Sequence, residues 1–495
     1  MLPARRIRSR QFLLFASFAL LPLVLAGILV SCGGVNYGMS GGTGAIHVSL
    51  TDPPSCMFPA GNFKHVYMSI RSVQAHVDAT AGDNSSGWQE LAFQLNSQPM
   101  QIDLFSTASS TCLLTTLGSN MALPAGTYQQ IRLLLVSNSG SPGPVPTTNN
   151  CGSQGYNCVV LSDDTVHELN LSSQANTGLK IPPGQVMGGP IMVGAGQDVD
   201  LDIDFNACAS IILEGNGQYR LKPALTAQQV GTSNTGISGQ VVDASTSLPI
   251  VGGNTMVAIE AKDASGTDTI FMQSATDSSG NFNFCPLPSG MTFDVVAVAV
   301  NGAGVGYNAT VTVGVPGGTN LGAIPLIAET GTSPGPTAFH GWVTVTTGSA
   351  PASVDVLVSA IQNVPLSGGG TLPVTIPPEA TPTADSGANL SLDSATDCPP
   401  SPPANANCAS YTLIEPASNP SVGMFSAGKM TAYSAPLAGD VLYSIRANAF
   451  VPLSGGASDC MPNVATVTQD SSANPLKAVP GGNVTPATIS FTGCS

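Results

Sequence analysis

The chain has 495 residues, which is too long for one ordinary hydrophobic core and suggests about three domains. Gly (55) and Pro (39) are abundant and only 9% of residues are charged, yet 42% are hydrophobic, so turn-rich β structure is favoured over disorder. The formal net charge of −15 repels phosphate backbones and argues against nucleic acid as a partner.

The first predicted element is an export signal. Four of the fourteen basic residues lie before residue 11, and the apolar stretch Phe12–Val30 follows them. The next residues, Leu29-Val30-Ser31-Cys32, resemble a bacterial lipobox. That resemblance implies a signal peptide over residues 1–31, alkylation of the Cys32 thiol by a diacylglycerol, and usually acylation of the new amino terminus. An uncleaved transmembrane anchor is the alternative, because the apolar run is nearly long enough to cross a bilayer.

The lipobox resemblance implies a location as well as a modification. The membrane partner would be held through the amino-terminal lipid, and several buried acyl chains make such attachment long-lived. Gly33 follows the cysteine, and no Asp stands there to indicate retention at an inner membrane. In an organism with two membranes, we therefore expect the outer one.

The remaining cysteines suggest disulfides. Eleven cysteines less Cys32 leave ten, an even number in an oxidising compartment, so up to five disulfides are expected. Short separations make the closest pairs the easiest loop closures, and a further pair would hold the C-terminus. These pairs are Cys151 with Cys158, Cys398 with Cys408, and Cys460 with Cys494. Zinc is not expected, because there is no Cys-x-x-Cys pair and the histidines are scattered.

After a flexible spacer (residues 32–43, including Cys32), a first domain is predicted over residues 44–228. Alternating apolar residues predict strands rather than helices throughout this region. The expected strands are 45–50, 66–70, 73–77 and 130–136, and residues 159–161 and 165–169 are expected to form a hairpin.

Several sequence blocks stand out in this first domain. They are Val48-Ser49-Leu50-Thr51-Asp52, Trp88-Gln89-Glu90-Leu91, Ile102-Asp103-Leu104, Leu123-Pro124-Ala125-Gly126-Thr127-Tyr128, Ile131-Arg132-Leu133, Thr177-Gly178-Leu179-Lys180-Ile181, Asp202-Ile203-Asp204-Phe205 and Tyr219-Arg220-Leu221-Lys222-Pro223. In this order the blocks resemble the family called domain of unknown function 4382, common in lipoproteins. The resemblance implies location and architecture but no activity. The loop 138–158 and the extra cysteines depart from the family pattern.

A second domain is predicted over residues 236–328, with characteristic blocks at residues 237–243, 248–250, 276–282, 287–290 and 293–298. These blocks resemble a carboxypeptidase regulatory-like module, which implies a small transthyretin-type β-sandwich without catalysis of its own. Within them, Asp277–Gly280 is expected to form a turn, after which Phe282 and Phe284 point inward.

A third β-sandwich-like domain is predicted over residues 337–495. Its first strand, 340–345, is similar to the first strand of the second domain. Its end, Val479-Pro480-Gly481-Gly482 followed by 487–491, is similar to Val315-Pro316-Gly317-Gly318 followed by 321–326. We expect a Pro-rich insertion over residues 363–420 to enlarge this domain. The fold class is therefore all-β, with tandem β-sandwich domains on a lipid-anchored tether.

The sharpest local pattern is the alternation from Asp198 to Phe205. It places the carboxylates of Asp198, Asp200, Asp202 and Asp204 on one strand face and four apolar side chains on the other. A solvated acidic face that deters edge pairing is the favoured interpretation. Calcium binding is the alternative, since neighbouring carboxylates can share a hard cation when a loop supplies further oxygens.

Other residues that can carry chemistry form no catalytic pattern. Gly38-Met39-Ser40-Gly41-Gly42 fits the nucleophile-elbow spacing but lies in the spacer, without the strand and helix that such a site needs. The five histidines form no close ligand pair in the sequence. Trp88 and Trp342 are expected to be buried in strands, rather than exposed for stacking on sugars.

The sequence thus favours a non-enzymatic, surface lipoprotein that acts as a structural or interaction scaffold, with protein or glycan partners and no cofactor. A carbohydrate- or calcium-binding accessory module is the second hypothesis. An exported hydrolase whose site assembles only in three dimensions is the third.

Overall fold

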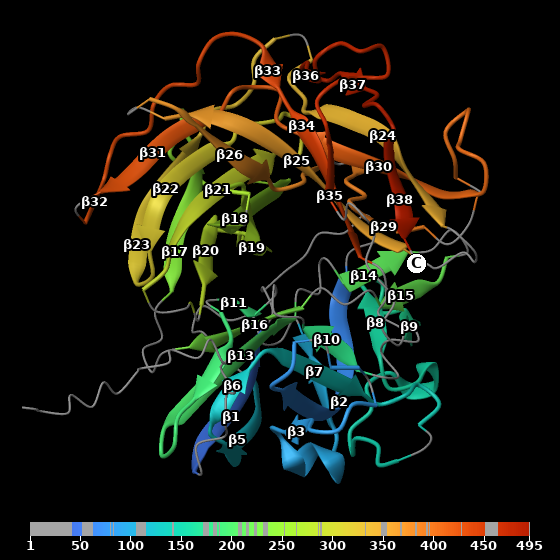
Figure 1. The fold of residues 1–495 in the computed structure, drawn as a ribbon. Coiled ribbons are helices and arrows are strands. Elements are labelled where there is room, and N and C mark those ends of the chain that lie inside the picture. The colour runs from blue at the N-terminus through green and yellow to red at the C-terminus, as the bar shows by residue number, and fades with distance from the viewer. Residues whose placement is uncertain are drawn as a thin grey trace, which may run out of the picture. The chain divides into compact units, whose positions relative to one another are not determined.

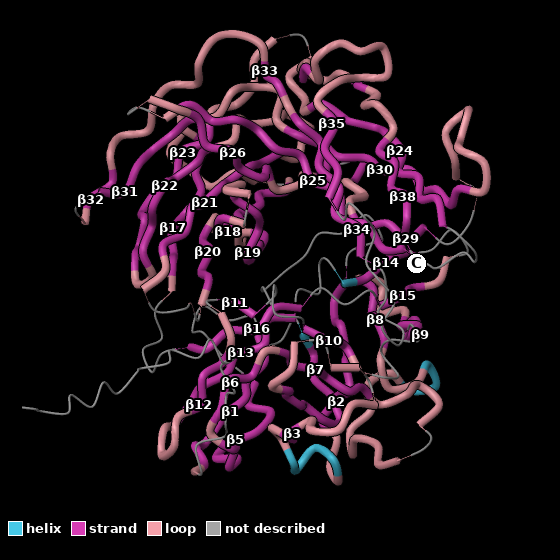
Figure 2. Tube along the Cα trace, in the orientation of Figure 1, coloured by secondary structure: helices cyan, strands magenta, loops and turns pink. Residues whose placement is uncertain are grey.

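The computed structural model describes residues 42–494 with gaps, and the chain it describes is all-β (Figures 1 and 2). The gaps are residues 52–62, 80, 83, 105–114, 141–142, 172–177, 182–185, 188, 206–209, 214–216, 222–224, 231–235, 252, 264, 286, 288–289, 332, 348–353, 367–368, 382–383, 393–394, 396, 427 and 451–463. Short 3-10 helices occur at η1 (Phe93–Asn96) and η3 (Gly152–Gln154). Among the described residues, no helix has the length and apolar character needed to cross a membrane.

The N-terminal module, residues 43–230, contains two main sheets whose inner faces share one core. The five-stranded sheet has the order β11 (Val186–Met187), β16 (Leu225–Val230), β13 (Asp198–Phe205), β1 (Thr43–Thr51), β5 (Thr115–Pro124). The nine-stranded sheet has the order β10 (Leu179–Ile181), β7 (Gln130–Leu135), β2 (Phe63–His76), β8 (Cys158–Leu161), β9 (Val166–Leu171), β15 (Tyr219–Leu221), β14 (Ile211–Leu213), and β3 (Gln89–Glu90) and β4 (Met100–Asp103) also pair with β2. A separate pair is β6 (Gly126–Tyr128) with β12 (Ile191–Val193).

Strand β2 corrects one expectation from the sequence. The segments predicted as separate strands, 66–70 and 73–77, lie in one strand of 14 residues, except for residue 77, which follows its end. Its pairing with β7 shifts register between Ile70 and Ser72, and this bulge interrupts the alternation that the prediction followed. The predicted hairpin of β8 and β9 is present, with Val160 opposite Val166.

The middle module, residues 237–328, begins with β17 (Ile237–Asp243), which pairs antiparallel with β20 (Asn281–Phe284) and parallel with β23 (Thr319–Leu326). The predicted turn before β20 is confirmed. The Asp277 carboxylate accepts the backbone N–H groups of Ser279 and Asn281 at 2.8 Å each, and Gly280 has a φ of 77°. As the alternation predicts, Phe282 and Phe284 are buried.

The C-terminal module, residues 337–494, repeats this arrangement. Its first strand, β24 (Thr337–Thr347), pairs antiparallel with β30 (Ala406–Glu415) and parallel with β37 (Asn483–Val484) and β38 (Ile489–Cys494). The Pro-rich segment 363–420, expected as an insertion that enlarges this domain, supplies β30 and a strand of the largest sheet, β26 (Thr371–Ile376). Short pairs are β27 (Ala380–Thr381) with β28 (Ala384–Asp385) and β33 (Val441–Leu442) with β36 (Lys477–Ala478).

One eleven-stranded sheet runs through both of these modules (Figure 1). Its order is β32 (Lys429–Met430), β31 (Ser421–Ser426), β22 (Thr310–Pro316), β21 (Thr292–Val300), β18 (Asn254–Lys262), β19 (Asp268–Ala275), β26, β25 (Val354–Pro365), β34 (Ser444–Phe450), β35 (Val464–Val467), with β29 (Asn389–Leu392) paired to β25. The modules meet in this sheet where β22 pairs with β31 and β19 with β26. We call this junction the seam.

Candidate functional site

The acidic strand β13 lies in the interior of its sheet. It pairs parallel with β1 and antiparallel with β16, so it has no free edge to protect. Asp198 is exposed and Asp200 half-buried, but Asp202 and Asp204 are buried. The prediction of a solvated acidic face is therefore wrong for the second half of the strand.

The two buried aspartates do not form a metal centre by themselves. The Gln228 amide donates to the Asp202 carboxylate at 3.3 Å, and burial, with the Asp202 charge second, holds the pKa of Asp204 well above its usual range. Within the described residues, no group of three or more His, Cys, Asp or Glu side chains is arranged to hold a metal ion. Calcium binding at this strand stays a prediction.

Two of the three expected cysteine pairs are disulfides. Cys151 is bonded to Cys158 and Cys398 to Cys408, closing loops at separations of 7 and 10 residues. Cys285 is also disulfide-bonded. Cys32, the serine of the Gly38–Gly42 pattern, and Cys460 lie outside the described residues, so the lipid anchor and the Cys460 to Cys494 pair stay predictions.

His65, His76, His167, His340 and the two tryptophans each make contacts with neighbouring side chains or main chain. His65 Nδ1 lies 2.7 Å from the Asp103 carboxylate, and the Arg132 guanidinium lies 4.0 Å from the centre of the Trp88 ring. Trp88 and Trp342 are half-buried and belong to none of the three apolar cores, so the prediction that they are core residues is wrong. The Arg132 contact covers one face of Trp88, a face that a sugar would need.

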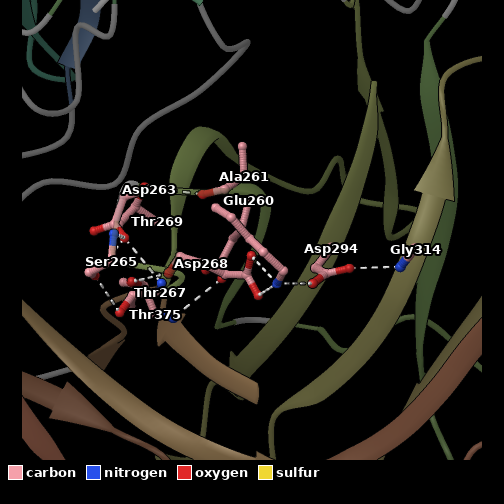
Figure 3. A network of polar contacts seen from close by, with 11 residues as sticks. Glu260, Ala261, Asp263, Ser265, Thr267, Asp268, Thr269, Asp294, Gly314 and Thr375 are labelled. Atoms are coloured by element: carbon pink, nitrogen blue, oxygen red, sulfur yellow. Dashed lines mark hydrogen bonds and ion pairs between the residues drawn. The ribbon is translucent and has the colours of Figure 1, made fainter. Parts of the chain in front are cut away.

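The seam contains a dense polar network at the end of the β18–β19 hairpin (Figure 3). Lys262 Nζ lies 2.9 Å from both oxygens of Asp268 and 3.7 Å from Asp294 Oδ2. In turn, Asp294 Oδ1 accepts the Gly314 N–H at 2.7 Å. One half-exposed ammonium group therefore faces two buried carboxyl groups.

The neighbouring Glu260 is fully buried and points into the same network (Figure 3). Its Oε2 accepts the backbone N–H of Thr375 at 3.3 Å, which joins β18 of the middle module to β26 of the C-terminal module. Burial and the nearby Asp268 charge raise the pKa of Glu260 well above its usual range. Burial and Asp294 raise the pKa of Asp268 to about 7.

A second acidic cluster, Glu329, Glu379 and Glu415, also lies at the seam, and we call it the glutamate cluster. All three side chains are buried. Burial raises the pKa of Glu329 to about 7. Burial, and then repulsion from a neighbouring glutamate, hold the pKa values of Glu379 and Glu415 well above the usual range. At acidic pH all three groups are neutral acids in the folded protein.

Sequence reasoning missed both acidic clusters, although one of them leaves a signal. Glu260 follows the uncharged run Asn254–Ile259, and every residue of that run is buried. Because both faces of β18 are covered, a carboxyl group at the end of this run enters the interior. The three glutamates of the other cluster are separated by tens of residues, and no local pattern joins them.

A surface hollow of about 450 Å³ is the remaining candidate. Asp440, Asp470, Lys477 and Asn483 contribute its polar lining, and Lys477 Nζ pairs with Asp440 Oδ1 at 2.6 Å. None of the described residues that line it is aromatic, so it offers no platform for stacking on a sugar ring.

Comparison with solved structures returns surface proteins at very low similarity. The shaft pilin SpaA from Lactobacillus rhamnosus GG is 9% identical, with 59% of this chain and 99% of that chain covered and a TM-score of 0.17. The minor pilin from Streptococcus agalactiae is 11% identical (53% and 97% covered, TM-score 0.14). A streptococcal ancillary pilin is 9% identical (90% and 98% covered, TM-score 0.16). TM-scores this low carry no argument about fold or function.

Comparison by sequence finds a match for the N-terminal part of the chain. No curated protein matches the chain. Residues 43–223 match the model of the family described as "Domain of unknown function (DUF4382)". This match covers the N-terminal module and confirms the resemblance expected from its sequence blocks. The N-terminal module is therefore similar to DUF4382 domains.

Proposed function

We propose that this chain is an exported lipoprotein, anchored through Cys32, that acts at the bacterial cell envelope as a non-enzymatic structural or interaction scaffold. The export signal and the lipobox-like Leu29-Val30-Ser31-Cys32 support the anchor. The match of residues 43–223 to DUF4382 brings no activity with it.

The observation that carries the scaffold role is the continuous sheet through the middle and C-terminal modules. Backbone pairing of β22 with β31 extends from Thr310 opposite Ser421 to Val313 opposite Met424. One apolar core also takes residues from both modules, including Val298 and Val311 from one and Val356 and Ile445 from the other. Such a junction resists hinge motion, which is the property that a rigid spacer or display platform needs.

Buried carboxyl groups at the seam support the same proposal. Glu260 bonds to the backbone of Thr375, and Glu329 to the backbone of Ala417. In both cases a glutamate carboxyl group accepts a hydrogen bond from the main chain of the C-terminal module. Acidic side chains that serve in an exported hydrolase are expected instead around an open cleft that admits substrate.

Metabolic labelling tests the anchor. The full chain is expressed in a bacterium fed an alkyne-bearing fatty acid, beside a Cys32→Ala variant. The wild type is expected to become labelled and to fractionate with membranes, whereas the variant stays unlabelled. Unlabelled wild-type protein would contradict the lipoprotein assignment.

Protease treatment of intact cells tests the surface role of the same labelled protein. A scaffold that faces outward is expected to lose its folded modules to added protease while the labelled amino terminus stays in the membrane. Complete protection in intact cells, with cleavage only after lysis, would place the modules inside the envelope and contradict a surface role.

A further inference from the structure

The glutamate cluster joins the two modules through main-chain hydrogen bonds. Glu329 follows β23 and donates its own N–H to the Gly306 carbonyl at 2.8 Å, within the middle module. Its Oε1 accepts the N–H of Ala417 at 2.6 Å, just beyond β30 of the C-terminal module. A side chain methyl at Gly306 would lie 3.2 Å from Glu329 Oε2, so the main chain approaches the carboxyl group closely here.

The other two glutamates enter the same place from the C-terminal module. Glu379 follows β26 and donates its N–H to the Ile414 carbonyl at 3.0 Å, next to Glu415 at the end of β30. The backbone of Ala299, from β21 of the middle module, lies against the Glu379 carboxyl group. Neither carboxyl oxygen of Glu415 has a hydrogen-bond partner among the described residues.

The groups around the cluster offer no positive charge. Tyr443 faces all three glutamates, and its hydroxyl donates to the Pro416 carbonyl at 2.8 Å. In the part of the chain that the structure describes, no Lys, Arg or His pairs with Glu329, Glu379 or Glu415. A buried carboxylate without a counter-ion is far less stable than the neutral acid, and each ionisation makes the next one costlier.

We propose that Glu329, Glu379 and Glu415 form a proton-controlled clasp that closes the seam when the three carboxyl groups are neutral and loosens it when they ionise. This inference goes beyond the proposed function and does not depend on the lipid anchor. The Ala417 N–H favours the ionised form of Glu329 but only partly offsets the cost of its burial, so raised pH draws water to the cluster and opens the main-chain bonds around it. The rigidity of the two-module body thereby follows the acidity of its surroundings.

The raised pKa values of the three glutamates give the direction of the effect. Each group binds its proton more tightly in the folded state than in an unfolded chain. The stabilisation that neutral carboxyl groups provide is complete below the unfolded-state pKa and is lost as the pH rises through the folded-state pKa values, of which that of Glu329 is about 7.

Hydrogen exchange of the full-length protein, corrected for the intrinsic effect of pH, tests the clasp. Protection of the Glu329 and Ala417 N–H groups is expected to fall about tenfold or more between roughly pH 6 and pH 9. The N–H groups of Val257 and Ala297, inside the same sheet, are expected to keep their protection. Equal protection of Glu329 and Ala417 across this range would overturn the proposal.

Gln substitutions separate proton binding from simple packing. The triple variant Glu329→Gln, Glu379→Gln, Glu415→Gln keeps the side-chain shapes, and its amide oxygens can still accept main-chain N–H groups, but none of the three can ionise, so its seam is expected to stay protected at high pH. The matched control is Asp440→Asn, which removes an exposed carboxylate and is expected to keep the wild-type pH profile. A triple variant with an unchanged pH profile would overturn the assignment to these glutamates.

One further measurement distinguishes a proton from a cation. Adding calcium or the chelator EGTA at about pH 6 is expected to leave the exchange at the seam unchanged, because the carboxyl groups are then neutral. Loss of protection on adding EGTA would overturn the clasp, since it would show that a bound cation neutralises the glutamates. This measurement uses wild-type protein and so does not depend on whether a variant folds.

Discussion

The Arg446 guanidinium lies 2.6 Å from the Asp263 carboxylate, and this pair joins β34 of the C-terminal module to the loop after β18 of the middle module. Both side chains are largely buried, with 11% and 21% exposed. The same carboxylate accepts the N–H groups of Ser265 and Thr267 and so forms its own turn (Figure 3). The ion pair is thus a specific link across the seam.

A double-mutant cycle of Asp263→Asn and Arg446→Met is expected to give a coupling energy of about 1–3 kcal/mol. Asn keeps the oxygen that forms the turn, so the change isolates the charge. Urea unfolding followed by the fluorescence of Trp342, in a Trp88→Phe background, reports on this part of the chain.

The matched control is the exposed pair of Lys64 and Asp164, at 2.6 Å, with 51% and 71% of the side chains exposed. Its coupling energy, followed by Trp88 in a Trp342→Phe background, is expected to stay below about 0.5 kcal/mol because water screens it. Equal coupling in the two cycles would contradict the view that the Asp263 pair is a structural link.

How much the sequence could predict depends on the range of each interaction. The Asp277–Gly280 turn and the hairpin of β8 and β9 were predictable because residues a few positions apart determine them. The same holds for the disulfides at separations of 7 and 10 residues. Local chemistry was sufficient in each case.

Burial of polar groups was not predictable in this way. The four aspartates of β13 alternate as in an exposed strand, but pairing with β16 places Gln228 beside Asp202 and makes the strand internal. Glu329, Glu379 and Glu415 come together only after two modules pair their strands. A candidate site built from residues so far apart in the sequence shows no regular spacing by which it could be predicted.

The carboxyl network around Asp268 is expected to make the protein less stable as the pH rises. The pKa of Asp268 is raised to about 7 by burial and by Asp294, above its value in an unfolded chain. Its contribution is therefore fully present at acidic pH and is lost as the pH rises through about 7, a loss of a few kcal/mol at most.

Urea midpoints at about pH 5.5 and pH 8.5, reported by Trp342, measure this loss. An Asp268→Asn variant is expected to show a smaller drop between the two pH values, because Asn cannot ionise. Glu168→Asn in the N-terminal module serves as the control and leaves the drop unchanged. A wild-type midpoint that rises with pH would contradict this assignment.

At acidic pH the opposite trend is expected from Asp243. Burial acts to raise its pKa, but hydrogen bonds from Ser245, Thr246 and the Tyr307 hydroxyl prevail and lower it to about 2. This depressed pKa provides stability above the unfolded-state value near 4, and that stability is lost as the pH falls toward 2. The effect is expected to stay below about 1 kcal/mol because Asp243 is partly solvated.

An Asp243→Asn variant is expected to flatten the acid limb of the stability curve while leaving the alkaline limb intact. Tyr307→Phe removes one of the hydrogen bonds and is expected to shift the acid limb to higher pH by a fraction of a unit. An unchanged acid limb in both variants would show that other carboxylates dominate acid unfolding.

Calcium titration decides between the two interpretations of β13. We expect no saturable heat from the wild type, because Asp202 already accepts the Gln228 amide and burial keeps Asp204 protonated. To bind at Asp204, a cation would have to displace the proton of its buried carboxyl group. The free-energy cost of removing this proton rises with the pKa of the group. Calorimetry of the full chain, beside an Asp200→Asn, Asp202→Asn variant, measures this directly. Saturable binding that the variant loses would establish the strand as a calcium site and favour the accessory-module hypothesis over a scaffold.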